Sequence, residues 1–189
     1  MPSANLFDSF PTLTSPTLVL RKITAQDIEE IYALYSNARI FEFCGIFNKY
    51  NKAVLLKDIS HYERNFVKKK RIKWGIALND GTGKVIGIIE TMDYKIRASQ
   101  VTIGYFLHPD YWHKGYATEA VRILVHYLFA EVGLQRIDAE VLLANLHSKQ
   151  VLLKNGFQLE RVMLQEKQWP SKGLVDLELY SLTAADYHS

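Results

Sequence analysis

Cysteine is almost missing from this sequence, since Cys44 is the only one among 189 residues. A single cysteine cannot form an internal disulfide, and it leaves neither a CxxC redox pair nor a thiol-rich metal site. We therefore expect no metal centre and a reducing, cytoplasmic setting. Cys44 is interpreted as a small buried residue, because the sequence shows no histidine poised to activate its thiol.

Long apolar runs and a strong charge imbalance are also missing. No apolar stretch approaches the ~18 residues of a membrane span, and the first residues lack the basic start and apolar segment of a signal peptide. The formal net charge of +3 is too small to indicate nucleic acid by itself. We expect neither a membrane nor a nucleic acid as a direct partner, although an anionic ligand would be tolerated.

Two nucleotide-binding motifs are absent as well. GxxxxGK[ST] does not occur, which disfavours a P-loop triphosphate site. There is no GxGxxG and no early parallel strand-helix-strand unit, so a dinucleotide-binding fold fits badly.

The apolar periodicity nevertheless predicts a well-filled α/β (α+β) domain. Strands are expected at 18–23, 72–79, 84–92, 100–107, 136–143, 157–165 and 174–182, and helices at 24–37, 51–70, 116–133 and 145–154. The order indicates one mixed sheet with helices on its faces. Residues 1–17, rich in Ser, Thr and Pro, are expected to form an arm that leads into a single domain at 18–189.

The stretch YWHKGYATEA, residues 111–120, stands between an expected strand and an expected helix. The first backbone N–H groups of a helix lack intrahelical partners and carry the positive end of the helix dipole, so they form an anion site. Gly115 permits close approach of a phosphate, Ala117 keeps the next turn small, and His113 and Lys114 add donors. A lone glycine is a weak signal, and a plain strand-to-helix turn would also use one.

The segments IGYFLHPDYWHKGYATEAVRILVHYLF and LQRIDAEVLLANLHSKQVLLKNGF resemble the acetyl-coenzyme A core of the GNAT superfamily of N-acetyltransferases. More narrowly, they resemble its RimJ and RimL branch, which acetylates N-termini of ribosomal proteins. The resemblance implies a mostly antiparallel, splayed sheet with acetyl-coenzyme A (acetyl-CoA) as cofactor. It implies these cofactor contacts: Phe106 and Leu107 through their main chain, His113, Lys114, Gly115, Tyr116, Ala117 and Thr118 around the pyrophosphate, and Asn145 and Ser148 along the pantetheine arm.

Departures from the family pattern leave the chemistry open. Many members carry a tyrosine acid four residues before the glycine of the GF pair, where this sequence has Leu152. Ser148 becomes the candidate for protonating the thiolate, although a serine hydroxyl is a poor acid. The branch's glutamate is replaced by Thr102, so Glu90, Asp93 and Glu140 become candidate bases. Each also fits a plain surface carboxylate at the end of a strand at least as well.

The acceptor is predicted to be a primary amine. A peptide α-amine, with a pKa near 7.8, is about one-third neutral at pH 7.5, whereas a lysine amine is only ~0.1% neutral. Weak base machinery therefore favours an N-terminal α-amine, such as that of a ribosomal protein. A small amine (polyamine, amino acid or antibiotic) and a non-catalytic acyl-CoA sensor remain alternatives, and either a monomer or a homodimer is compatible.

In the family, acceptor contacts usually come from the first two helices and the segment that connects them. The resemblance therefore implies acceptor contacts here from ARIFEFCGIFNKY and from the loop around Trp169. Glu42 could pair with a cationic amine. An aromatic lining is expected from Phe41, Phe43, Phe47 and Tyr50, although packing under a loop would account for aromatics equally well.

Overall fold

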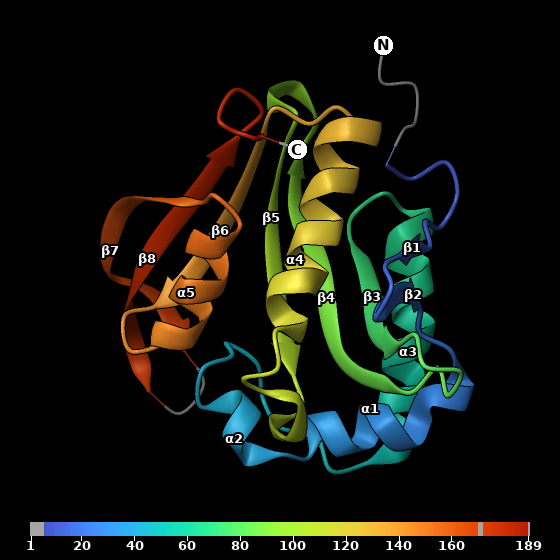
Figure 1. The fold of residues 1–189 in the computed structure, drawn as a ribbon. Helices are drawn as coiled ribbons and strands as arrows, with labels where there is room; N and C mark the ends of the chain where they lie inside the picture. The colour runs from blue at the N-terminus through green and yellow to red at the C-terminus, as the bar shows by residue number, and fades with distance from the viewer. Residues whose placement is uncertain (1–5, 170–171, 189) are drawn as a thin grey trace.

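An eight-stranded sheet organises the computed structural model of this protein, which describes residues 6–169 and 172–188 (Figure 1). The strands are β1 (Leu13–Thr14), β2 (Leu18–Lys22), β3 (Ile72–Leu78), β4 (Val85–Lys95), β5 (Gln100–Leu107), β6 (Arg136–Leu142), β7 (Gln158–Trp169) and β8 (Gly173–Thr183). The helices are α1 (Ile28–Tyr35), α2 (Ala38–Phe41), α3 (Lys52–Val67), α4 (Tyr116–His126) and α5 (Leu146–Lys154).

The sheet is mixed and mostly antiparallel, in the order β1-β2-β3-β4-β5-β6-β8-β7. The pairing of β5 with β6 is parallel, and the other neighbouring strands pair antiparallel. The β5–β6 pairing stops at Thr102 opposite Asp138, although both strands continue. The expected α+β class and the splayed sheet are both confirmed.

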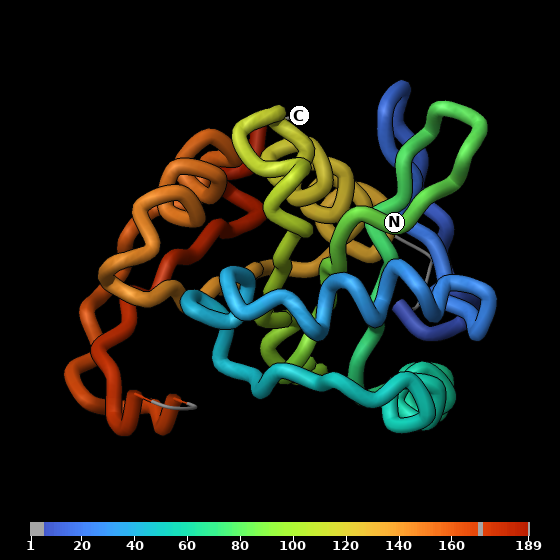
Figure 2. The backbone as a smooth tube through the Cα atoms, turned by 90° about the horizontal axis from the view of Figure 1, so that it is seen from below, coloured from blue at the N-terminus to red at the C-terminus, as the bar shows by residue number. Residues whose placement is uncertain are grey.

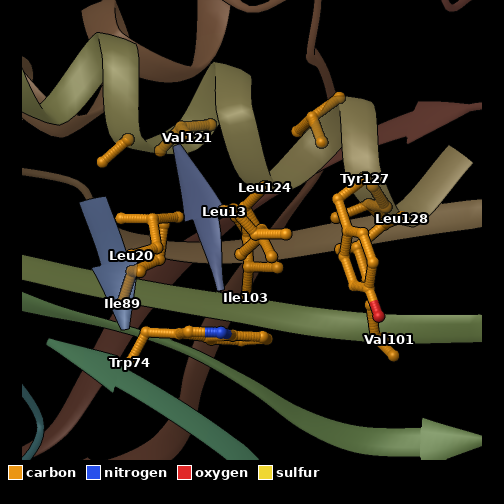
Figure 3. Close-up of a cluster of buried hydrophobic side chains, with 14 of the residues drawn as sticks. Leu13, Leu20, Trp74, Ile89, Val101, Ile103, Val121, Leu124, Tyr127 and Leu128 are labelled. Carbon is orange, nitrogen blue, oxygen red and sulfur yellow. The ribbon is translucent and has the colours of Figure 1, made fainter. Parts of the chain in front are cut away.

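Helices cover both faces of this sheet. Helix α4 lies along one face over β4 and β5 (Figure 1), where its apolar stripe meets the main core. Figure 3 shows Val121 and Leu124 of α4, and Leu128 of the turn that follows it, pointing toward the sheet, where Trp74, Ile103 and Val101 lie. Helices α1, α2 and α3 pack on the other face around a second core. Figure 2, seen from below, shows the segment between α2 and α3 running along the same side of the sheet as α3.

The segment before β2 packs into the domain over its described part. Leu6 and Phe7 are buried in the main core, and β1 pairs with β2. The hydroxyls of Ser15 and Thr17 donate hydrogen bonds to the Glu119 carboxylate in the first turn of α4. Residues 1–5 of the expected arm lie outside the described residues, and the boundary at residue 18 stays a prediction.

The chain also contains elements that the periodicity did not indicate. Besides β1, helix α2 begins after Asn37, whose side chain accepts a hydrogen bond from the Arg39 N–H. Helix α4 continues into a π-helical turn, Tyr127–Glu131, before Gly133 with its φ of 78° ends it. Across residues 6–169 and 172–188, no helix has the length and apolar character needed to cross a membrane.

Candidate functional site

The turn before α4 carries a row of free backbone donors. Within the described chain, no hydrogen bond uses the backbone N–H groups from His113 to Thr118. Gly115 caps the helix with a φ of 84°, and a methyl group built on it would meet no atom within 4 Å. Left-handed turns and helix N-termini present such donors to anions. This row of donors, residues 113–118, is called the cradle below. Its chemistry suits a phosphate group, and its assignment to the coenzyme stays a prediction.

Two imidazoles flank this cradle. His113 itself adopts a left-handed conformation with a φ of 59°. Its ring lies edge-on to that of His147 in α5, with 4.7 Å between the ring centroids. Lys114 lies nearby, with its ammonium 5.5 Å from the Tyr111 ring centroid. His147 is an addition to the predicted set, because only the fold brings α5 beside the turn.

Side chains around the turn hold its position. The Trp112 indole N–H donates to the Leu107 carbonyl over 2.8 Å, and the Arg39 guanidinium lies 5.2 Å from the Trp112 ring centroid. The carboxylate of Glu119 accepts the hydroxyls of Ser15 and Thr17. Burial opposes its ionisation, but these hydrogen bonds outweigh burial and hold the pKa of Glu119 below its usual value. Tyr111 and Trp112 therefore brace the turn against the sheet.

Beyond Thr102, the facing edges of β5 and β6 are not paired with each other. Unpaired strand edges leave backbone donors and acceptors for an extended ligand. Phe106 and Leu107 lie on this part of β5, as the resemblance implies for the pantetheine contacts. The Leu107 carbonyl already accepts the Trp112 indole, so one of its acceptor positions is taken.

The gap between β5 and β6 beyond Thr102 is called the splay below. The N-terminus of α5 lies across this gap from β5. Asn145 caps the helix, with its side-chain oxygen accepting the Ser148 N–H over 3.1 Å. The hydroxyls of Ser148 and Tyr105 are 2.9 Å apart. Burial raises the pKa of Tyr105 well above its usual value, although the Ser148 contact opposes this, so the phenol stays neutral. Tyr105 is a candidate site residue that the sequence analysis missed.

Two of the three predicted bases, Glu90 and Glu140, are engaged in ion pairs, and Asp93 is exposed. Glu90 on β4 lies 3.2 Å from the Lys73 ammonium and 3.4 Å from the Arg71 guanidinium, with its carboxylate largely buried. Glu140 on β6 pairs with Lys167 of β7. The structure therefore places them on different strands, each with cationic partners of its own.

The aromatic residues of the predicted acceptor segment differ in how far they are buried. The ring centroids of Phe41 and Phe106 are 6.3 Å apart. Phe43 packs against a small apolar cluster that contains Trp169. Phe47 and Tyr50 are exposed, so packing under a loop does not account for them, and their contact with the acceptor stays a prediction. The Glu42 carbonyl accepts the Lys172 ammonium over 2.8 Å.

Cys44 is half-buried, so it is less enclosed than the sequence indicates. Burial, with a smaller contribution from the Glu90 charge, raises the pKa of its thiol to about 12. A thiol of this kind is protonated near neutral pH and is a poor nucleophile. In the described part of the chain, no group of three or more His, Cys, Asp and Glu could hold a metal ion.

A comparison with protein families decides the identity of the fold. The model described as "Acetyltransferase (GNAT) domain" matches residues 17–158. The chain belongs to the GNAT family. It is therefore an N-acetyltransferase, and the matched range includes the cradle, the splay and α5. Acetyl-CoA or coenzyme A is the ligand that members of this family bind.

Known GNAT proteins resemble the chain over nearly its whole length. The uncharacterized N-acetyltransferase YoaA of Bacillus subtilis is 34% identical over 173 residues, covering 92% of this chain and 97% of YoaA. RimJ of Mycobacterium smegmatis, solved with CoA-disulfide, has a TM-score of 0.82 at 19% identity, covering 95% of this chain and 89% of RimJ. The ribosomal-protein-S5-alanine acetyltransferase of Vibrio fischeri has a TM-score of 0.81 at 17% identity, covering 95% and 100%.

The GNAT fold gathers most of the predicted cofactor residues into one region. The cradle residues from His113 to Thr118 precede or begin α4, and Asn145 and Ser148 begin α5 beside the splay. Their assignment to the coenzyme stays a prediction. The signal for Tyr105 was present in the sequence, since it follows Gly104 in the splayed strand, but its partner lies 43 residues away.

Proposed function

We propose that this acetyl-CoA-dependent N-acetyltransferase acts on the α-amine of a protein or peptide N-terminus. The ion pairing of Glu90 and Glu140, two of the three expected bases, carries this proposal. Glu90 faces two cations and Glu140 faces one, so neither is a carboxylate without a cationic partner, and the third, Asp93, is exposed. An acceptor that supplies its own neutral amine suits such a site.

The acceptor's own pKa decides between amine classes. Model values near 7.8 for an α-amine and 10.4 for a lysine differ by about 2.6 units, which corresponds to about 3.5 kcal/mol in the free energy of deprotonation. An enzyme with little base assistance therefore works far better on an α-amine. The structural similarity to RimJ and to a ribosomal-protein-S5-alanine acetyltransferase supports the same class.

Acetyl-CoA supplies an activated thioester carbonyl. The neutral amine forms the new C–N bond as the C–S bond breaks, and the proton lost by the amine balances the proton gained by the departing thiolate. Ser148, with its hydroxyl 2.9 Å from the Tyr105 hydroxyl, would donate a hydrogen bond to the sulfur. Tyr105 stays neutral and acts as a positioning residue for that hydroxyl.

The cradle supplies binding and the splay supplies orientation. Each charge-assisted contact from a backbone N–H to a phosphate contributes about 1.5 to 3 kcal/mol, so three or four contacts suffice to anchor a pyrophosphate. The unpaired edges of β5 and β6 would hold the pantetheine arm extended, with its end near Ser148.

The test measures thiol release with acetyl-CoA and a panel of amines. The panel contains N-terminal peptides with free and with blocked α-amines, lysine side-chain amines, polyamines and aminoglycosides. We expect release with free N-termini and loss of release when the α-amine is blocked. Turnover of lysine or polyamine alone would refute the proposed acceptor. Coenzyme binding without turnover of any amine would instead identify a sensor.

A further inference from the structure

A cavity of about 250 Å³ opens on the face of the sheet covered by α1 and α3. It borders the splayed strand, because Glu90 in its wall lies opposite Gly104 of β5. Tyr35, also in the wall, packs edge-on against Phe106 with 5.8 Å between ring centroids. The cavity therefore adjoins the part of β5 where the thioester arm is expected.

The charged lining of this cavity has a cationic surplus. Lys49, Arg71 and Lys73 face two carboxylates, those of Asp58 and Glu90. His61 is a further basic group in the wall, and Tyr35, Ile46, Tyr62 and Asn65 complete it. A site lined in this way repels polycations and attracts an anionic group.

The cations differ in how firmly they are held. Lys73 is almost fully buried, with its ammonium 3.2 Å from Glu90 and 4.7 Å from the Tyr62 ring centroid. Lys49 pairs with Asp58. Arg71 is 41% exposed in its side chain and reaches Glu90 only at 3.4 Å, so it is the cation most able to turn to a ligand.

Glu90 contributes a second, complementary feature. Its Oε2 atom is buried and finds no hydrogen-bond partner within residues 6–169 and 172–188, despite the neighbouring cations. The same atom lies 3.2 Å from the Lys73 ammonium and 3.4 Å from the Arg71 guanidinium, so its charge is paired, but neither contact has hydrogen-bond geometry and a well-aligned donor is still missing. An amine N–H entering the cavity would supply that donor, and it would bring the amine toward the Gly104 end of the splay.

We propose that the acceptor carries an anionic group close to its amine, so that Glu90 receives the amine and Arg71 receives the anion. This inference rests on the proposed function. For a peptide acceptor, it predicts a preference for an acidic residue next to the N-terminal residue. A free amino acid, whose carboxylate is close to its amine, offers the same chemistry from another source.

The test compares peptides that share the N-terminal residue Ala and differ in the second residue as Asp, Asn or Lys, with amidated C-termini. Thiol release from acetyl-CoA gives kcat/KM for each peptide. Alanine and alaninamide form the arm for free amino acids. We expect the Asp peptide to exceed the Asn peptide by about fivefold to tenfold at low salt. The ratio should fall with added salt, since the pairing is partly exposed.

Arg71→Gln should bring the Asp-to-Asn ratio toward one. Lys70→Gln is the matched control: it removes the same charge from the preceding exposed residue, which does not line the cavity, and should keep the ratio. Turnover of alanine above alaninamide, with the same loss in Arg71→Gln, would support the charge pairing and identify the free amino acid as its source.

Equal rates for the Asp and Asn peptides, or a preference for Lys, would overturn this inference and leave the proposed function intact. A ratio unchanged in Arg71→Gln and insensitive to salt would also overturn it. Absence of thiol release with every amine, while coenzyme A still binds, would overturn the proposed function itself, so the two failures are distinguishable.

Discussion

Replacing Gly115 tests the cradle most sharply. Its φ of 84° is unfavourable for any L-residue, so Gly115→Ala should lower the free energy of unfolding by about 1 kcal/mol. The added methyl meets no protein atom, so it would project into open space where we place the phosphate. Loss of one or two charge-assisted N–H contacts would cost about 1.5 to 6 kcal/mol of binding, a rise in Kd of at least about tenfold.

The assay is calorimetric titration with coenzyme A, accompanied by thermal unfolding. Gly81→Ala is the matched control, because Gly81 has a φ of 88° and open space around it but lies in the β3–β4 turn. Both variants should lose similar stability, and only Gly115→Ala should lose affinity. Equal affinity in the two variants would refute the assignment of the cradle to the pyrophosphate.

Four further predictions follow from the same contacts. Tyr105→Phe should lower kcat by about fivefold with little change in the KM for acetyl-CoA, because it leaves the Ser148 hydroxyl unpositioned, and Ser148→Ala should lower kcat at least as much. An unchanged kcat in both variants would exclude this pair from the chemistry. Glu119→Gln should destabilise the protein at pH 7; because the folded pKa lies below the unfolded value of 4.5, the difference from wild type should shrink as pH falls below 4.5, which acid titrations of stability would detect. His147→Asn should weaken coenzyme binding about threefold in calorimetry, and an unchanged Kd would place the imidazole pair outside the site. Leu6→Ala should cost about 2 to 5 kcal/mol in chemical denaturation, whereas a loss below 0.5 kcal/mol would mean that the segment before residue 18 is a loose arm.

Much of the fold could be predicted from local sequence signals. The turn at Asp80–Gly83, the stripe of α4 and the glycines that end helices are all local, because they depend on residues a few positions apart. The cradle was predictable for the same reason: its donors, its glycine and its helix lie within one continuous stretch. Helix α2 was missed because four residues are too few for an apolar period to show.

The catalytic surroundings depend on contacts that sequence spacing hides. Tyr105 meets Ser148 only because β5 and α5 approach across the splay. The Glu90 ion pair depends on a register shift in the β3–β4 hairpin. Ala77 opposes Val85. A regular ladder continued from that pair would place Ile89 opposite Lys73. The bulge at Ile76 and Ala77 moves Glu90 opposite Lys73 instead, and such a one-residue shift also decides which face a side chain occupies.

The sequence alone could not identify the general base, because the cationic partners of the candidate carboxylates come from other segments of the chain. Glu90 and Glu140 read as free carboxylates on strands, but Arg71, Lys73 and Lys167 reach them only in the folded sheet. These ion pairs make Glu90 and Glu140 poorer bases, which favours the proposal of an acceptor amine that is already partly neutral.

The most direct measurement of the central claim uses one peptide that carries both kinds of amine. The peptide has a free N-terminal alanine and an internal lysine, and it is incubated with the protein and acetyl-CoA. Fragmentation mass spectrometry then locates the acetyl group. We predict that it lies on the α-amine of the N-terminal residue. Acetylation of the lysine side chain, with the α-amine left free, would contradict the account.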